Sequence, residues 1–191
     1  QRESKNVREN AGVLDGSTLG KIEIKGKDAL AFMNLIYTNS FSKMKPGSSR
    51  YALMLGEDGM VKDDGIICKI SDEHFIATTT TGGAATVLGC MEEYAQTEWP
   101  NLNVYMNSIT EQYATFNISG PKTRNIIEKV FPEVNFSNEA FPFMTFQFHE
   151  YEDIPLRILR ASFTGEMGYE IYVPSNQALK IWEKIINFGK E

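Results

Sequence analysis

The stretch Leu159 to Tyr172, LRASFTGEMGYEIY, constrains the fold more than any other part of the sequence. An extended run over 154–162 leads into a segment with two glycines within four residues, which allow positive φ and close backbone approach. A second extended run follows over 169–173. The pattern predicts a strand–turn–strand unit with Glu166 at its tip, where a rigid turn can hold a carboxylate against a polar ligand. An ordinary hairpin turn with a solvated Glu166 is the alternative.

Composition excludes several classes of partner. The chain has a net charge of -6 and a pI of about 5.1 without a basic stripe, so nucleic acid is not an expected partner. The apolar runs are too short to span a bilayer, so no membrane is expected either. Cys68 and Cys90 belong to no CxxC motif, which favours reduced thiols in a cytoplasmic protein. His74 and His149 lack ligand spacing, so no metal site is predicted.

Periodicity and turn residues predict an α+β chain in two lobes, approximately 19–110 and 111–191, the second lobe including 1–18. The first lobe has the element order of a ferredoxin-like antiparallel sheet with one added strand, and the second is a looser α/β lobe. Expected strands cover 19–25, 51–55, 61–70, 75–80, 102–109, 112–119, 141–148, 154–162 and 169–173. Expected helices cover 3–10, 28–37 and 84–98, with one more from Pro121 to Val130 and a last one capped by Ser175.

Two adjacent carboxylates, Asp63 and Asp64, lie in an expected strand after the hairpin turn Glu57-Asp58-Gly59. Neighbouring strand residues face opposite sides of a sheet, so one carboxylate can be solvated while the other points into a cleft. An inward carboxylate beside a ligand amine can accept its proton. Ordinary hairpin charges are the alternative for both residues.

Two further positions near these carboxylates could contact a ligand. Tyr51, in the paired strand, could stack on an aromatic ring or use its hydroxyl, although simple half-buried packing also explains it. Thr80 belongs to a run of four threonines before Gly82-Gly83 and an expected helix N-terminus, where free N–H groups favour anions and carbonyl oxygens. Threonines are also good strand formers, which is the structural alternative.

Several segments together carry a family resemblance. ThrGlyGlu-x-Gly-x-Glu after an Arg-containing strand resembles the glycine-cleavage T-protein (aminomethyltransferase) family. The likeness extends over nearly the whole chain and sharpens in IYTNSF (36–41), RYALMLGEDGMVKDDG (50–65), TTTTGGAA (78–85) and TEWP (97–100). This combination is similar to the C-terminal, folate-binding half of the α subunit of heterotetrameric sarcosine oxidase. The threonine loop departs from the Asn-containing version usual in T-proteins, which favours the oxidase branch.

The resemblance implies tetrahydrofolate as the cofactor and assigns roles to five positions. Asp64 matches the catalytic carboxylate that faces folate N10, with Asp63 as the alternate. Tyr51 matches a folate-contacting tyrosine, and Thr80 lies in a cofactor-facing loop. Glu166 would pair with the pterin amino and ring N–H donors. Phe163 stands where T-proteins often have Tyr, so a hydroxyl contact is lost there.

The resemblance also implies a reaction and partners. A flavin elsewhere in the complex would oxidise an N-methyl amine to an imine, and the one-carbon unit would be captured as 5,10-methylenetetrahydrofolate. FAD, FMN and NAD are expected only in other parts of that complex, because the chain has no GxGxxG, and other sarcosine oxidase subunits are the expected partners. Both ends look cut, so we expect a fragment that is inactive alone.

Two rival interpretations remain. An aminomethyltransferase or a dimethylglycine oxidase-like folate domain would act within the same superfamily. A non-catalytic folate-binding scaffold, as in related iron–sulfur assembly factors, is the alternative from another class. Those factors carry Lys-Gly-Cys-x-x-Gly-Gln-Glu, whereas this chain has Arg-Ala-Ser-Phe-Thr-Gly-Glu over 160–166.

Overall fold

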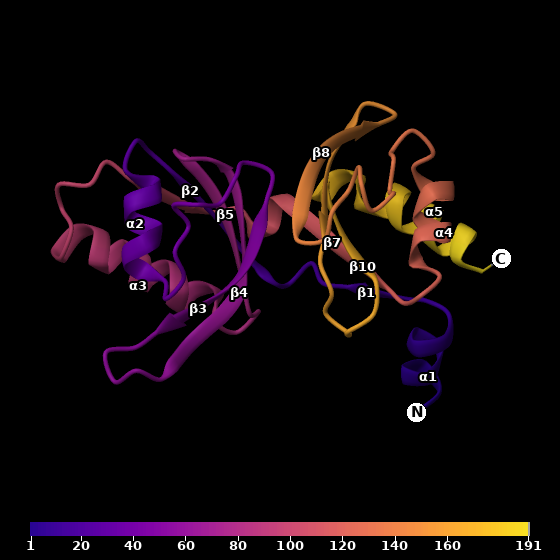
Figure 1. Cartoon of the computed structure of the whole chain (residues 1–191), viewed down its shortest axis with the longest axis horizontal. Coiled ribbons are helices and arrows are strands. Elements are labelled where there is room, and N and C mark those ends of the chain that lie inside the picture. Colours follow the sequence, from indigo (N-terminus) through magenta and orange to yellow (C-terminus); the bar gives the residue numbers. More distant parts are fainter. Residues whose placement is uncertain (191) are drawn as a thin grey trace. The chain divides into compact units, whose positions relative to one another are not determined.

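The computed structural model describes residues 1–190, which form two compact units (Figure 1). One unit is Leu19–Thr110. The other combines Gln1–Thr18 with the described residues from Glu111 onward. Each unit has its own five-stranded sheet and its own apolar core, so each is described by itself.

The unit Leu19–Thr110 is an antiparallel sheet with two helices. Its elements are β2 (Gly20–Lys25), α2 (Ala29–Ile36), β3 (Ser49–Leu55), β4 (Val61–Ser71), β5 (His74–Thr79), α3 (Ala84–Thr97) and β6 (Tyr105–Ser108). The strand order is β3-β4-β5-β2-β6, and all neighbours are antiparallel. The order β6-β2-β5-β4 is the ferredoxin-like arrangement, and β3 is the added edge strand, so the predicted fold class is confirmed.

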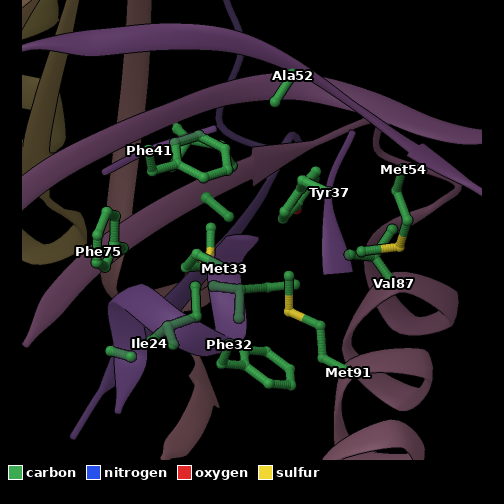
Figure 2. Close-up of a cluster of buried hydrophobic side chains, with 14 of the residues drawn as sticks. Ile24, Phe32, Met33, Tyr37, Phe41, Ala52, Met54, Phe75, Val87 and Met91 are labelled. Carbon is green, nitrogen blue, oxygen red and sulfur yellow. The ribbon is translucent and has the colours of Figure 1, made fainter. Parts of the chain in front are cut away.

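The core of this unit lies between one face of the sheet and both helices. Phe32 and Met33 of α2 are fully buried beside Val87 and Met91 of α3, and Figure 2 shows them converging under the strands. Strands β2, β3 and β5 contribute alternate residues to this core, as the two-residue period of a strand requires. On β3 these are Ala52 and Met54, whereas their neighbours Tyr51, Leu53 and Leu55 point to the opposite face. We call that opposite side the helix-free face of the unit.

The other unit has an antiparallel sheet of order β1-β7-β10-β9-β8. Its elements are α1 (Arg2–Glu9), β1 (Gly12–Asp15), a short 3-10 turn (Thr110–Gln112), β7 (Tyr113–Ser119), α4 (Thr123–Val130), β8 (Thr145–Tyr151), β9 (Ile154–Arg160), β10 (Gly168–Pro174), a second 3-10 turn (Ser175–Gln177) and α5 (Ala178–Gly189). The core lies between this sheet and helices α4 and α5, whose buried side chains include Ile127 and Ile181.

The structure differs from the sequence predictions at several element ends. Strand β1 was not predicted, because four residues carry too little periodicity. Strand β8 begins at Thr145, four residues later than predicted, since Met144 has φ 58°. The prediction that Ser175 caps the last helix is wrong: Ser175 opens a 3-10 turn and its Oγ donates to the Glu111 carbonyl at 2.7 Å, and α5 begins at Ala178.

Within residues 1–190, no helix is both long enough and apolar enough to cross a membrane. The same residues contain no group of three or more His, Cys, Asp or Glu side chains arranged to hold a metal ion.

Candidate functional site

Tyr51 and Asp64 form a hydrogen-bonded pair on the helix-free face of the unit Leu19–Thr110. Strands β3 and β4 pair Tyr51 with Ile66 and Leu53 with Asp64, so the two side chains are diagonal neighbours on one face. The Tyr51 hydroxyl donates to Asp64 Oδ2 at 2.7 Å. Tyr51 is 53% exposed and Asp64 is half-buried, so both remain accessible to a ligand. The pair combines an aromatic ring with an oriented carboxylate.

Asp63 has a different environment, on the helix-covered side of the same strand. It is 7% exposed, and its carboxylate accepts hydrogen bonds from the Thr80 backbone N–H at 3.1 Å and the Thr80 hydroxyl at 2.7 Å. The same Thr80 oxygen accepts the Gly83 N–H at 3.0 Å. Asp63 therefore anchors the loop that leads into α3, and Asp64 is the carboxylate presented outward. The sequence alone left this choice open.

Two glycines allow this arrangement because side chains do not fit at their positions. A Cβ on Gly65 would lie 1.9 Å from the Thr78 carbonyl oxygen, so β4 and β5 approach closely beside Asp64. A Cβ on Gly83 would lie 2.7 Å from both Asp63 Oδ1 and Thr80 Oγ1. Glycine at these sites keeps the strand and the loop in place.

The hydrogen bond to Asp64 changes the acid–base behaviour of Tyr51. Donation to the carboxylate stabilises the neutral phenol, and this hydrogen bond is the main cause that raises the Tyr51 pKa above its ordinary value. The phenol therefore stays a donor throughout the physiological pH range. A neutral tyrosine can hold the Asp64 carboxylate in one orientation without adding charge.

The turn between β9 and β10 carries the other predicted site residues, in the second unit. Gly165 has φ 83°, the left-handed region that the sequence predicted for this turn. The Ser162 hydroxyl donates to the Glu166 carbonyl at 2.6 Å and closes the turn. The Glu166 side chain is not a lone solvated carboxylate: Arg8 of α1 donates to its Oε1 at 2.9 Å.

Sequence reasoning missed Arg8. It lies 158 positions from Glu166, and no local spacing connects the two. The turn at Gly120 brings α1 to this region: Lys122 binds Asn10 through both its backbone N–H at 2.9 Å and its Nζ at 2.6 Å. The C-terminal end of α1 is therefore tied to the β7–α4 turn, and Arg8 reaches the β9–β10 turn from there.

A groove of about 740 Å³ lies beside this turn, between α1, strands β1 and β7 and the residues that follow β9. Such a volume is typical of small-molecule sites. Phe163 lines the groove and is 77% exposed, and Asn117 and Ser119 line it from β7 although both are buried. The wall therefore offers one open aromatic ring and two buried polar side chains.

The motif that carried the resemblance has a second carboxylate, Glu170, on strand β10. It pairs directly with Asn117 of β7, so the two side chains share the sheet face opposite the helices. Its Oε2 accepts a hydrogen bond from the Tyr172 hydroxyl at 2.6 Å. A carboxylate on a central strand is held more rigidly than one on a turn, so Glu170 is a second candidate for a ligand contact that the sequence analysis did not single out.

The structure thus divides the predicted site residues into two groups. Tyr51, Asp64 and Thr80 belong to the unit Leu19–Thr110, where Asp63 links Thr80 to the strand that carries Asp64. Phe163 and Glu166 belong to the other unit. The first group provides a carboxylate held by a neutral phenol, and the second provides a carboxylate and an aromatic ring beside a groove.

The architecture defines an α+β protein of two antiparallel sheets with site residues on each, and comparison with known proteins identifies its family. The model of the GCVT N-terminal domain matches residues 1–191, and the chain belongs to that family. The sarcosine oxidase subunit alpha of Corynebacterium sp. (strain U-96) is 48% identical over 191 residues, and that of Rhizobium meliloti (strain 1021) is 43% identical over 193. An aminomethyltransferase of Thermoanaerobacter pseudethanolicus is 33% identical over 195 residues.

The coverage of these relatives is partial. The chain is matched in full by the two sarcosine oxidase subunits but spans 20% of their length. It spans 50% of the Thermoanaerobacter aminomethyltransferase. These relatives are enzymes or subunits of enzymes.

Solved structures agree on the fold. The glycine cleavage system aminomethyltransferase T from Bartonella henselae has a TM-score of 0.82 at 24% identity, covering 97% of this chain and 48% of that one. A chain of the heterotetrameric sarcosine oxidase from Corynebacterium sp. U-96 has a TM-score of 0.69 at 10% identity, covering 99% of this chain and 90% of that one. The present chain therefore shares its fold with both solved proteins.

Proposed function

We propose that residues 1–191 form the tetrahydrofolate-binding part of a sarcosine oxidase alpha-type protein, which captures the one-carbon unit of an oxidised N-methyl amine as 5,10-methylenetetrahydrofolate. The observation that carries the proposal is the Tyr51–Asp64 pair, a carboxylate held by a neutral phenol on an accessible sheet face. The 48% identity to a sarcosine oxidase subunit alpha over the whole chain supports the oxidase branch.

The side chains present suit the cofactor. Tetrahydrofolate supplies two nitrogens, N5 and N10, that take up the carbon, and its N10 proton must be removed when the second bond to that carbon forms. Asp64 would accept that proton, since its Oδ1 has no hydrogen bond to a described residue while Oδ2 is occupied by Tyr51. The Tyr51 ring, 53% exposed, offers a surface for an aromatic part of the ligand.

The second unit supplies groups for a pterin ring. Glu166 has one carboxylate oxygen bound by Arg8, and a carboxylate suits the paired N–H donors of a 2-aminopyrimidinone edge. Phe163 provides an open ring beside the groove. In this proposal the flavin and nicotinamide chemistry belongs to other parts of the complex, and other subunits deliver the oxidised amine.

The test uses the full-length protein that contains this chain, in the assembly that it forms. Sarcosine, oxygen and tetrahydrofolate are supplied, and free formaldehyde and 5,10-methylenetetrahydrofolate are both quantified. We expect the folate product to replace free formaldehyde as tetrahydrofolate is added. Formaldehyde release that does not respond to tetrahydrofolate would contradict the proposal.

An aminomethyltransferase is the second candidate, favoured by the 33% identity over 195 residues to such an enzyme. Such an enzyme would transfer the methylene carbon of an aminomethylated lipoyl carrier protein to tetrahydrofolate and release ammonia and the dihydrolipoyl carrier, without amine oxidation. Supplying that carrier in place of sarcosine separates the two reactions. A scaffold that binds folate without turning it over would yield binding but neither product.

A further inference from the structure

The groove beside the β9–β10 turn contains a buried donor that the proposed roles of Phe163 and Glu166 leave unexplained. Asn117 lines this groove from the central strand β7, and its side chain is 7% exposed. Buried amides in proteins are nearly always hydrogen-bonded at both ends. An end of the Asn117 amide that has no partner in the protein is therefore available to hydrogen-bond a ligand in the groove.

Only one end of this amide has a partner among the described residues. The Ser119 hydroxyl donates to Asn117 Oδ1 at 2.6 Å, which uses the oxygen as an acceptor and fixes the plane of the amide. The Nδ2 group makes no hydrogen bond within residues 1–190. The Nδ2 atom is not completely shielded from solvent, and because Asn117 lines the groove, Nδ2 is accessible from it. The groove wall thus presents an oriented N–H donor.

The neighbourhood of Asn117 narrows the ligand chemistry. Glu170 lies directly across from it on β10 and shares its sheet face, but the described residues that line the groove do not include Glu170. The exposed ring of Phe163 also lines the groove. A planar ring with a carbonyl oxygen on one edge complements Phe163 and the Asn117 amide, because the ring can stack on Phe163 and the oxygen can accept the Nδ2–H.

We propose that Asn117 is a specificity-determining residue that donates its Nδ2–H to a carbonyl oxygen on the edge of a planar ring bound in this groove. The inference rests on the proposed function, in which that ring is the pterin of tetrahydrofolate. The carbonyl is then the 4-oxo oxygen. Asn117 selects the 4-oxo ring over a 4-amino ring, because an amino group would direct a donor at the Nδ2 donor. A donor facing a donor leaves both unpaired, which costs affinity.

The test compares tetrahydrofolate with its 4-amino analogue, tetrahydroaminopterin, as ligands of the full-length protein. Affinities of both are measured anaerobically by calorimetry for the wild type and for Asn117→Asp, which has the same shape but only acceptors. We expect the affinity ratio to shift roughly tenfold or more toward the 4-amino ligand in Asn117→Asp. Asn117→Ala should lose affinity for the 4-oxo ligand and show an intermediate ratio.

Controls keep the outcome specific. Asn125→Asp makes the same change on the exposed side of α4 and should leave the ratio unchanged. Thermal melting verifies that each variant folds. If Asn117→Asp does not fold, the affinity ratio is tested with Asn117→Ala alone. An unchanged ratio in both Asn117 variants, with tetrahydrofolate still bound, overturns the role of Asn117. A wild type that binds neither ligand overturns the proposed function as well, so the two failures are distinct.

Discussion

The Tyr51 hydroxyl lies 2.7 Å from Asp64 Oδ2 and fixes the carboxylate on the accessible face of the β3–β4 hairpin. The neighbouring Asp63 points to the other side of the strand and binds Thr80. Two adjacent aspartates therefore have separate tasks: one is presented to a ligand and the other holds the loop before α3.

Replacing Asp64 by Asn should uncouple folate chemistry from amine oxidation. Removal of a positioned base costs about 10² to 10⁴ in rate, so we expect methylenetetrahydrofolate formation to fall by that factor in the full-length protein. Oxidation of the amine should continue and release formaldehyde. Asp64 is half-buried outside the core, so melting should change little. An undiminished yield of the folate product in Asp64→Asn would refute its role as the base.

The acid–base behaviour of Tyr51 gives a test that needs no substrate. The Asp64 carboxylate raises the Tyr51 pKa, so the phenol should ionise at higher pH than a free tyrosine, whose pKa is about 10. Since the folded-state pKa is raised, the small stabilisation is complete below pH 10 and is lost as the pH rises through the folded value. Ultraviolet titration, with Tyr51→Phe to identify the signal, should show this shift and its loss in Asp64→Asn. If Tyr51 titrated with the same pKa in the wild type and in Asp64→Asn, the hydrogen bond between Tyr51 and Asp64 would not exist in solution.

The buried partner should behave differently on substitution. In Asp63→Asn the side chain keeps one acceptor oxygen and gains a donor, so one of the two Thr80 donors loses its partner. A buried unsatisfied group costs about 1–3 kcal/mol, which should speed hydrogen exchange of the Thr80 and Gly83 amides by roughly tenfold or more. Asp64→Asn is the matched control and should leave those amides protected. Identical exchange in the two variants would mean that Asp63 does not anchor the loop.

Gly65 should tolerate no side chain. In Gly65→Ala the new Cβ would lie 1.9 Å from the Thr78 carbonyl oxygen, which is backbone and cannot rotate away. We expect a loss of more than about 2 kcal/mol in stability, seen as lost exchange protection along β4 and β5. A Cβ on Gly82 meets nothing within 4 Å, so Gly82→Ala is the matched control. Comparable protection in both variants would contradict the close strand contact.

The carboxylates of the motif can be separated by paired substitutions. We expect Glu166→Gln to weaken tetrahydrofolate binding about 10- to 100-fold, the value of a charge-assisted contact of roughly 1.5–3 kcal/mol. Melting should stay nearly constant, because Arg8 is exposed (59%), Glu166 is only half-buried (28% exposed), and ion pairs near the surface contribute about 0–1 kcal/mol. Glu170→Gln is measured alongside by calorimetry. Loss of binding only in Glu170→Gln would assign the pterin contact to Glu170 and leave Glu166 as the partner of Arg8.

Local chemistry allowed most of the fold to be predicted. The alternation of Ala114, Phe116 and Ile118 with polar residues is enough to define β7, and Gly165 is enough to place a turn with positive φ. Local signals fail where an element is short or where a tertiary contact sets its end. Strand β1 is held by pairing with β7, a partner about a hundred positions away, and Ser175 binds the Glu111 carbonyl rather than capping α5.

The sequence by itself determined the strands other than β1, the turn with its two glycines, and the presence of paired aspartates after a hairpin. These features follow from the φ/ψ preferences of single residues and from the two-residue period of side chains in a strand. Both are determined by residues that are neighbours along the chain. Only the tertiary structure decided which aspartate faces outward, that Arg8 reaches Glu166, and that Asn117 lies in a groove wall across from Glu170. Those relationships depend on strand register and on packing between distant segments, because hydrogen bonds act over about 3 Å in space whatever the separation in sequence.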